Sequence, residues 1–112
     1  DPRDSIVGAH ITDDLADFGV PYERTDDLRR RRAISWRYQY DIMQATPPPA
    51  RRIHVRFEEF VLKQEETLRR LEDFLGFPMA RIPVRPESVG RWRTDTETHD
   101  FDFFPREALY EG

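Results

Sequence analysis

Of the 112 residues in this chain, 38% are hydrophobic and 36% are charged, which is polar for a free-standing globular domain. The length allows one domain at most, and an aromatic content of 12% excludes disorder throughout. The chain has no cysteine, which excludes disulfides and thiolate metal sites, and no apolar run approaches the ~18 residues of a membrane span.

The first half of the chain is predicted to be helical. A helix is expected to begin at Pro2 and to end at Gly19. Thr25, followed by two acidic residues, predicts the N-cap of a second helix, which continues to about Ala45. Three consecutive prolines, Pro47 to Pro49, end this helix and predict a stiff connector.

The second half is predicted to hold one strand, one helix and a long loop. Apolar and polar residues alternate over residues 52–57, which is the period of a strand. An acidic turn is expected next, and then a helix that ends at Gly76. Residues 79–100 lack periodicity and predict a loop, and residues 105–110 begin to look helical. The apolar face of the helix consists of Leu68, Leu71, Phe74 and Leu75.

The cationic residues are almost all arginine. Lys63 is the only lysine, so 17 of the 18 cationic residues are arginine. A GC-rich genome explains this ratio as well as phosphate binding does, although the planar guanidinium fork suits phosphate better than an ammonium group. The run from Arg29 to Arg32, followed by Trp36, Tyr38 and Tyr40, also raises the alternative of nucleic-acid binding. A helix spreads four consecutive residues around all of its sides, so we expect a solvated, ion-paired helix instead.

Three segments together resemble one family. The segment RRIHVRFEEFVLKQEETLRRLEDFLGFP, at 51–78, resembles the V-R-Y-E-D-L … L-R-R-L … F-L-G block of sulfotransferases that use 3′-phosphoadenosine-5′-phosphosulfate (PAPS). DPRDSIVGAH, at 1–10, resembles the start of that family's 3′-phosphate helix, R-D-P-R-D-x-x-x-S. RPESVGRWR, at 85–93, resembles its late phosphate loop. The three matches come in family order and cover most of the chain.

The resemblance implies an α/β fold, a P-loop-type three-layer sandwich with a parallel sheet. Residues 1–112 would be the C-terminal part of one such domain, mostly helical with one or two strands, and the N-terminal half with the phosphosulfate loop would be absent. The implied activity is transfer of a sulfuryl group from PAPS to a hydroxyl or amine acceptor, without a metal or a nucleic-acid partner. We expect the chain alone to be inactive, cytoplasmic and prone to self-association. The alternative is a non-catalytic helical interaction module or a nucleic-acid-binding module.

The resemblance also implies the residues of a nucleotide site. Arg85 and Arg91 fall where the family places basic groups on the 3′-phosphate, with Ser88 and Gly90 shaping the loop. Phe57 falls where the family often has a tyrosine beside the adenine. From the residues alone, both arginines could equally be surface residues, and Phe57 could belong to the core.

The chain also departs from the family pattern. Gly8 takes the place of the phosphate-binding serine and has no hydroxyl. The family's helix arginine, its phosphosulfate-loop lysine and its general base have no counterpart here, so no catalytic residue is predicted. Trp92 is expected to anchor the late loop by packing. The three histidines, His10, His54 and His99, have no metal-like spacing.

Overall fold

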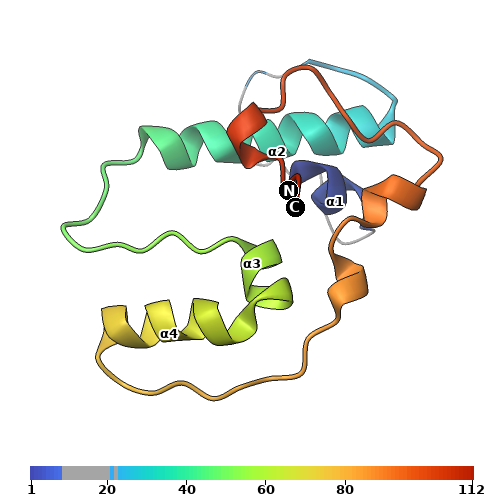
Figure 1. Cartoon of the computed structure of the whole chain (residues 1–112). Coiled ribbons are helices and arrows are strands. Elements are labelled where there is room, and N and C mark those ends of the chain that lie inside the picture. Colours follow the sequence, from blue (N-terminus) through green and yellow to red (C-terminus); the bar gives the residue numbers. More distant parts are fainter. Residues whose placement is uncertain (9–20, 22) are drawn as a thin grey trace. The chain divides into compact units, whose positions relative to one another are not determined.

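The computed structural model describes residues 1–8, 21 and 23–112 (Figure 1). The chain divides into two compact units. The first unit comprises Asp1–Pro47 and Gly90–Gly112, and the second unit comprises Pro48–Val89. Every regular element of the described residues is a helix or a single 3-10 turn. None of the helices in these ranges combines the length and the apolar character that crossing a membrane demands.

Helix α1, Pro2–Val7, opens the first unit. The carboxylate of Asp1 caps it by accepting a hydrogen bond of 2.9 Å from the Arg3 backbone N–H, and Pro2 occupies the first turn, where its missing N–H costs nothing. The predicted start of this helix at Pro2 is therefore confirmed. The predicted continuous helix is wrong, because α1 ends at Val7 and Gly8 is extended. The predicted end at Gly19 itself lies outside the described residues.

Helix α2, Leu28–Ala45, is the longest element. Its N-cap is Asp27, whose Oδ1 accepts hydrogen bonds from the backbone N–H groups of the second and third helical residues at 3.0 and 3.3 Å. The prediction of Thr25 as N-cap is wrong by two residues, because the Asp27 carboxylate is better placed to cap the first turn. The helix ends at Ala45 as predicted, with Thr46 capping it before the prolines.

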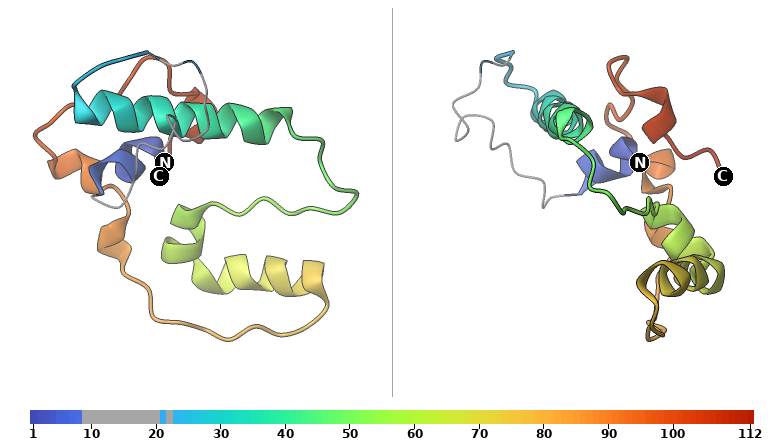
Figure 2. Two further views of the ribbon diagram at one scale, coloured as in Figure 1. Left: turned by 180° about the vertical axis from the view of Figure 1, so that it is seen from behind. Right: turned by 90° about the vertical axis from the view of Figure 1, so that its left-hand side faces the viewer.

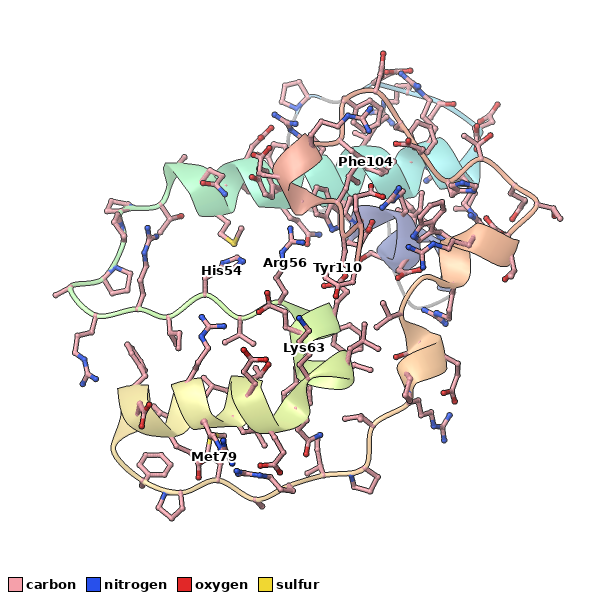
Figure 3. All side chains as sticks on the ribbon, in the orientation of Figure 1. His54, Arg56, Lys63, Met79, Phe104 and Tyr110 are labelled. Atoms are coloured by element: carbon pink, nitrogen blue, oxygen red, sulfur yellow. The ribbon has the colours of Figure 1, made fainter. Side chains whose placement is uncertain are left out.

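The core of the first unit joins α1, α2 and the C-terminal segment. Its buried apolar side chains come from all three parts, and the Trp36 ring packs edge-on against Phe104 with centroids 5.6 Å apart. Phe104 lies beside α2 (Figure 3). Burial of each of these larger side chains contributes about 1.5–3 kcal/mol to the stability of the unit. The core residues are Ile6, Ala33, Phe101, Phe104 and Leu109.

The second unit is a helical turn, α3 (Phe57–Leu62), followed by α4 (Gln64–Leu75). Gly76 ends α4 in the left-handed conformation, with φ of 82°, which confirms the predicted stop. The chain then runs back along α4 (Figure 2), and Met79 lies beside the helix (Figure 3). The side-chain amide of Gln64 holds this segment by donating to the Ile82 carbonyl at 2.9 Å and accepting from the Ile82 N–H at 3.1 Å.

The predicted strand at 52–57 is wrong for this chain. Residues 52–56 carry no regular secondary structure, and Phe57 already belongs to α3. Nothing in the described ranges forms a strand, so the backbone of this segment has no neighbouring ladder to join. The predicted acidic turn is also helical, because Glu58 and Glu59 lie in the first turn of α3, where carboxylates favour the helix dipole. The α/β sandwich stays a prediction.

The predicted loop over residues 79–100 is present and contains two short turns. These are the 3-10 turns η1, Pro86–Ser88, and η2, Arg91–Thr94. A third turn, η3 (Arg106–Ala108), is the helical segment expected near the C-terminus, limited to three residues. Of these elements, η2 belongs to the first unit and packs against α1, which brings the late loop next to the start of the chain.

Candidate functional site

One carboxylate fastens the late loop to helix α1. Asp4 Oδ2 accepts a hydrogen bond from the Gly90 N–H at 2.7 Å, and Asp4 Oδ1 accepts one from the Trp92 N–H at 3.0 Å. Turn η2 accordingly lies beside α1 (Figure 1). The amides on both sides of Arg91 are therefore bound by a side chain of α1.

Gly90 is needed for the shape of this loop. Its φ is +80°, a left-handed conformation that L side chains rarely adopt. A Cβ at this position would lie 2.6 Å from Nη1 of Arg93, because the Arg93 side chain folds back over the glycine. Glycine therefore satisfies both the backbone conformation and the close approach of a guanidinium group.

Arg91 and Gly8 lie side by side although they are far apart in the sequence. Arg91 is the first residue of η2, and Gly8 is the C-cap of α1 in an extended conformation. The Arg91 Nη2 atom lies 3.8 Å from the point that a Cβ of Gly8 would occupy, and no other side chain of the described residues approaches that point within 4 Å. Within the described part of the chain, the Arg91 guanidinium has no hydrogen-bond or ion-pair partner. Its donors remain available to an anion.

Trp92 anchors the loop by packing, as predicted. The Arg3 guanidinium carbon lies 3.8 Å from the centroid of the Trp92 ring on one side, and the His99 ring lies 5.1 Å away in a tilted arrangement. Arg3 is buried and also binds the Asp1 carboxylate at 2.8 Å and the Tyr110 carbonyl at 3.2 Å. These contacts fix Trp92 between the start of α1 and the C-terminal segment.

Other arginines of the first unit are occupied by carboxylates. Arg29 donates to both oxygens of Asp95, at 2.6 and 3.1 Å, and to Glu97 at 2.7 Å. The hydrogen bond from Arg29 lowers the pKa of Asp95 and raises the pKa of the guanidinium itself. Arg30 is paired with Glu23 at 2.8 Å. The expectation of an ion-paired helix is confirmed for Arg29 and Arg30.

The remaining predicted site residues belong to the second unit. Phe57 is the first residue of α3 and is 59% exposed, so its interpretation as a core residue is wrong. Arg85 is the exposed N-cap of η1, and its carbonyl accepts hydrogen bonds from the Ser88 N–H at 3.0 Å and the Ser88 hydroxyl at 2.6 Å. The structure thus brings together Gly8, Gly90 and Arg91, and it leaves Phe57, Arg85 and Ser88 in the other unit.

Two residues of the site were missed by the sequence analysis. Asp4 was not singled out, because an acidic residue in the first turn of a helix is common and carries no signal for a distant contact. Arg93 was passed over although it follows Arg91 by two residues, a spacing that a 3-10 turn can bring onto one loop. Among the residues that the structure places, no group of three or more histidine, aspartate or glutamate side chains could hold a metal ion.

Comparison with known proteins gives one match. The model of the sulfotransferase family matches residues 1–81 of the chain, which is most of its length. No curated protein and no solved structure matches the chain. The matched range includes Gly8 and Phe57 and ends before Arg85, so the late loop with Gly90 and Arg91 lies outside it.

Proposed function

The chain belongs to the sulfotransferase family, and from this we propose that it takes part in sulfuryl transfer from PAPS to a hydroxyl or amine acceptor. In this proposal the chain supplies the side of the site that holds the 3′-phosphate and the adenine. The observation that carries the proposal is the Arg91 guanidinium beside Gly8. It brings together two segments that resemble the phosphate helix and the phosphate loop of the family.

The charge distribution supports phosphate as the ligand. The formal net charge of the chain is −4, and arginines such as Arg29 and Arg30 are taken up by carboxylates. Arg91 is exposed and has no carboxylate partner among the described residues, and the Arg93 guanidinium folds over the same loop. Guanidinium groups bind phosphate through two parallel N–H···O bonds, so this loop offers a phosphate a charged, fork-shaped partner.

Sulfuryl transfer requires a general base and cationic groups at the leaving phosphate. In an in-line displacement the acceptor oxygen forms a bond to sulfur while the bond from sulfur to the nucleotide phosphate breaks, and a base takes the acceptor proton. Cationic groups must neutralise the leaving phosphate. The only lysine, Lys63, is the C-cap of α3 and follows no glycine-rich loop. We therefore assign none of these 112 residues to the phosphosulfate group or to the general base.

The residues of the second unit keep the roles that the family resemblance implies. Phe57 has an exposed aromatic ring, and we propose that this ring stacks on the adenine. Arg85 is an exposed arginine at the start of the late loop. The Ser88 hydroxyl stabilises turn η1, which follows Arg85, by donating to the Arg85 carbonyl. We assign Arg85 to phosphate binding on the family resemblance alone, which places a basic group at this position of the sequence.

Calorimetric titration with two nucleotides tests the proposal. The chain should bind 3′-phosphoadenosine-5′-phosphate more tightly than adenosine 5′-phosphate, which lacks the 3′-phosphate. Replacement of Arg91 by Ala removes a contact of about 1.5–3 kcal/mol and should weaken binding of the first nucleotide roughly 10- to 100-fold. Binding of the second nucleotide should hardly change. Arg91→Lys should recover only part of the loss, since an ammonium group cannot contact two oxygens as a fork.

Arg69→Ala is the matched control, because Arg69 is an exposed arginine on α4. It should leave both affinities unchanged. Arg85→Ala, tested in the same way, should follow Arg91→Ala. A wild-type chain without preference for the 3′-phosphorylated nucleotide contradicts the proposal, and so does an Arg91→Ala variant with unchanged affinity. Equal losses for both nucleotides would show that the loop has collapsed and would also count against a direct phosphate contact.

A further inference from the structure

We infer that Asp4 is a positioning residue of the nucleotide site, which holds the late loop so that Arg91 faces the ligand. This inference rests on the proposed function, because it needs a 3′-phosphate at Arg91. Asp4 itself does not touch the nucleotide in this scheme. It acts on the backbone at both sides of Arg91, through the Gly90 N–H at 2.7 Å and the Trp92 N–H at 3.0 Å.

The two hydrogen bonds restrain the backbone from which the Arg91 side chain extends. Gly90 and Trp92 flank Arg91, and each of their amides is bound by a different oxygen of one carboxylate. Fixing both flanking peptides to a single planar group leaves the backbone at Arg91 little freedom to rotate. A guanidinium group that is oriented before the ligand arrives loses less conformational entropy on binding.

The position of Asp4 on α1 explains why Arg91 lies over Gly8. Asp4 precedes Gly8 by four residues, and residues four apart lie on the same face of a helix. A loop fastened to Asp4 is therefore carried along the face of α1 that leads to Gly8. The observed 3.8 Å between Arg91 Nη2 and the Cβ point of Gly8 agrees with this arrangement.

The direction of the change in phosphate affinity distinguishes a positioning role of Asp4 from a purely electrostatic one. A carboxylate close to a bound phosphate repels it, so removal of the Asp4 charge should strengthen phosphate binding if the charge were its only effect. Asp4 forms no ion pair among the described residues, and its bonds to the loop go to neutral amides. If Asp4 positions Arg91, its removal should instead weaken phosphate binding. The two mechanisms predict opposite changes.

The experiment compares Asp4→Ala and Asp4→Asn in the 112-residue chain, titrated with 3′-phosphoadenosine-5′-phosphate and adenosine 5′-phosphate. Asp4→Ala should lower affinity for the first nucleotide about tenfold and change affinity for the second less than about twofold. Asp4→Asn should fall between wild type and Asp4→Ala, because its amide keeps one oxygen acceptor. Asp73→Ala, which removes an exposed carboxylate from α4, should change neither affinity.

Hydrogen exchange of the ligand-free chain supplies a second measurement. The Gly90 and Trp92 amides should exchange slowly in the wild type and fast in Asp4→Ala, while amides within α2 keep their protection. Unchanged or tighter binding of the 3′-phosphorylated nucleotide by Asp4→Ala overturns the inference, as does fast exchange of both amides in the wild type. An equal loss for both nucleotides overturns it too, because it marks a general structural role. If the wild type shows no preference for the 3′-phosphorylated nucleotide, the proposed function itself is wrong. If the wild type shows the preference and Asp4→Ala keeps it, only the inference about Asp4 is wrong.

Discussion

The guanidinium group of Arg3 lies over the ring of Trp92, with 3.8 Å between its carbon and the ring centroid. The same group binds the Asp1 carboxylate at 2.8 Å and the carboxylate of Glu111 at 3.2 Å. Arg3 thereby joins the start of α1, turn η2 and the C-terminal segment of the first unit. Because Trp92 is next to Arg91, this stack also holds one side of the proposed phosphate loop.

Replacement of Arg3 by Ala should destabilise the first unit. The Asp1 side chain is 1% exposed, and the substitution removes its ion pair of 2.8 Å with Arg3, a loss of about 3 kcal/mol for a buried pair. Urea unfolding followed by tryptophan fluorescence measures the effect, since Trp36 and Trp92 both belong to the first unit. Arg3→Lys should recover only part of the stability. Its ammonium group keeps the positive charge beside Asp1 but cannot donate two parallel hydrogen bonds or stack over the Trp92 ring as the guanidinium does. Unfolding midpoints that coincide for wild type and Arg3→Ala would contradict this account.

The Arg29–Asp95 pair should make the first unit sensitive to acid. The hydrogen bond from Arg29 holds the pKa of Asp95 below its ordinary value of 3.8. A carboxyl whose pKa is lowered by folding stabilises the fold fully above its unfolded pKa, and this contribution disappears as the pH falls through the folded pKa. The difference in melting temperature between wild type and Asp95→Asn should therefore be constant above about pH 5 and shrink below about pH 4.

Thermal melts at a series of pH values, followed by tryptophan fluorescence, measure this difference. Asp73→Asn is the matched control and should show no such pH dependence, because Asp73 is exposed on α4. A difference for Asp95→Asn that persists unchanged to about pH 2, below the ordinary pKa of an aspartate, would show that the pair does not act through ionisation of Asp95.

Two glycines with nearly the same conformation should respond differently to substitution. Gly90 and Gly76 have φ values of +80° and +82°, so Ala strains the backbone at both positions by about 1 kcal/mol. At Gly90 the added Cβ also meets Nη1 of Arg93 at 2.6 Å, whereas nothing lies within 4 Å at Gly76. Gly90→Ala should therefore displace the Arg93 guanidinium and weaken binding of 3′-phosphoadenosine-5′-phosphate several-fold, while Gly76→Ala should not. Calorimetric titration of both variants decides this, and equal affinities would remove Arg93 from the site.

The sequence predicted best those features that depend on neighbouring residues. The end of α2 at Ala45 and the stop of α4 at Gly76 follow from local caps and backbone preferences, and both are observed. The strand at 52–57 failed because alternation signals an extended segment, whereas a strand also needs a partner that local sequence does not reveal.

The site shows the same limit. The resemblance pointed to Gly8 and Arg91 separately, but the link between them through Asp4 depends on a contact between the two ends of the chain. Sequence spacing carries no signal for a hydrogen bond from a carboxylate to the backbone of a distant loop, since any residue type there supplies the amide. Arg93 could have been found, because it repeats the arginine on the other side of Trp92.

The substitution Gly8→Ser should improve the proposed site. Gly8 has φ of −70° and ψ of 144°, which any residue adopts, and a Cβ there would lie at ordinary contact distances of 3.8 Å from Arg91 Nη2 and from the Ser5 carbonyl oxygen. The serine hydroxyl would then lie beside Arg91 and could donate to the same phosphate, as the serine of the family pattern does. One added hydrogen bond of about 1 kcal/mol should raise affinity for 3′-phosphoadenosine-5′-phosphate roughly fivefold.

Gly8→Ala separates the hydroxyl from the added carbon. It fills the same space without a donor, so it should leave the affinity close to that of the wild type. Affinity for adenosine 5′-phosphate should stay the same in both variants, because the new donor has no 3′-phosphate to contact. A gain for Gly8→Ser that Gly8→Ala shares would come from stiffening of the chain after α1. The absence of any gain would show that the phosphate does not lie beside Gly8. The assignment of Arg91 to the 3′-phosphate would then lose the support that its position next to Gly8 gives.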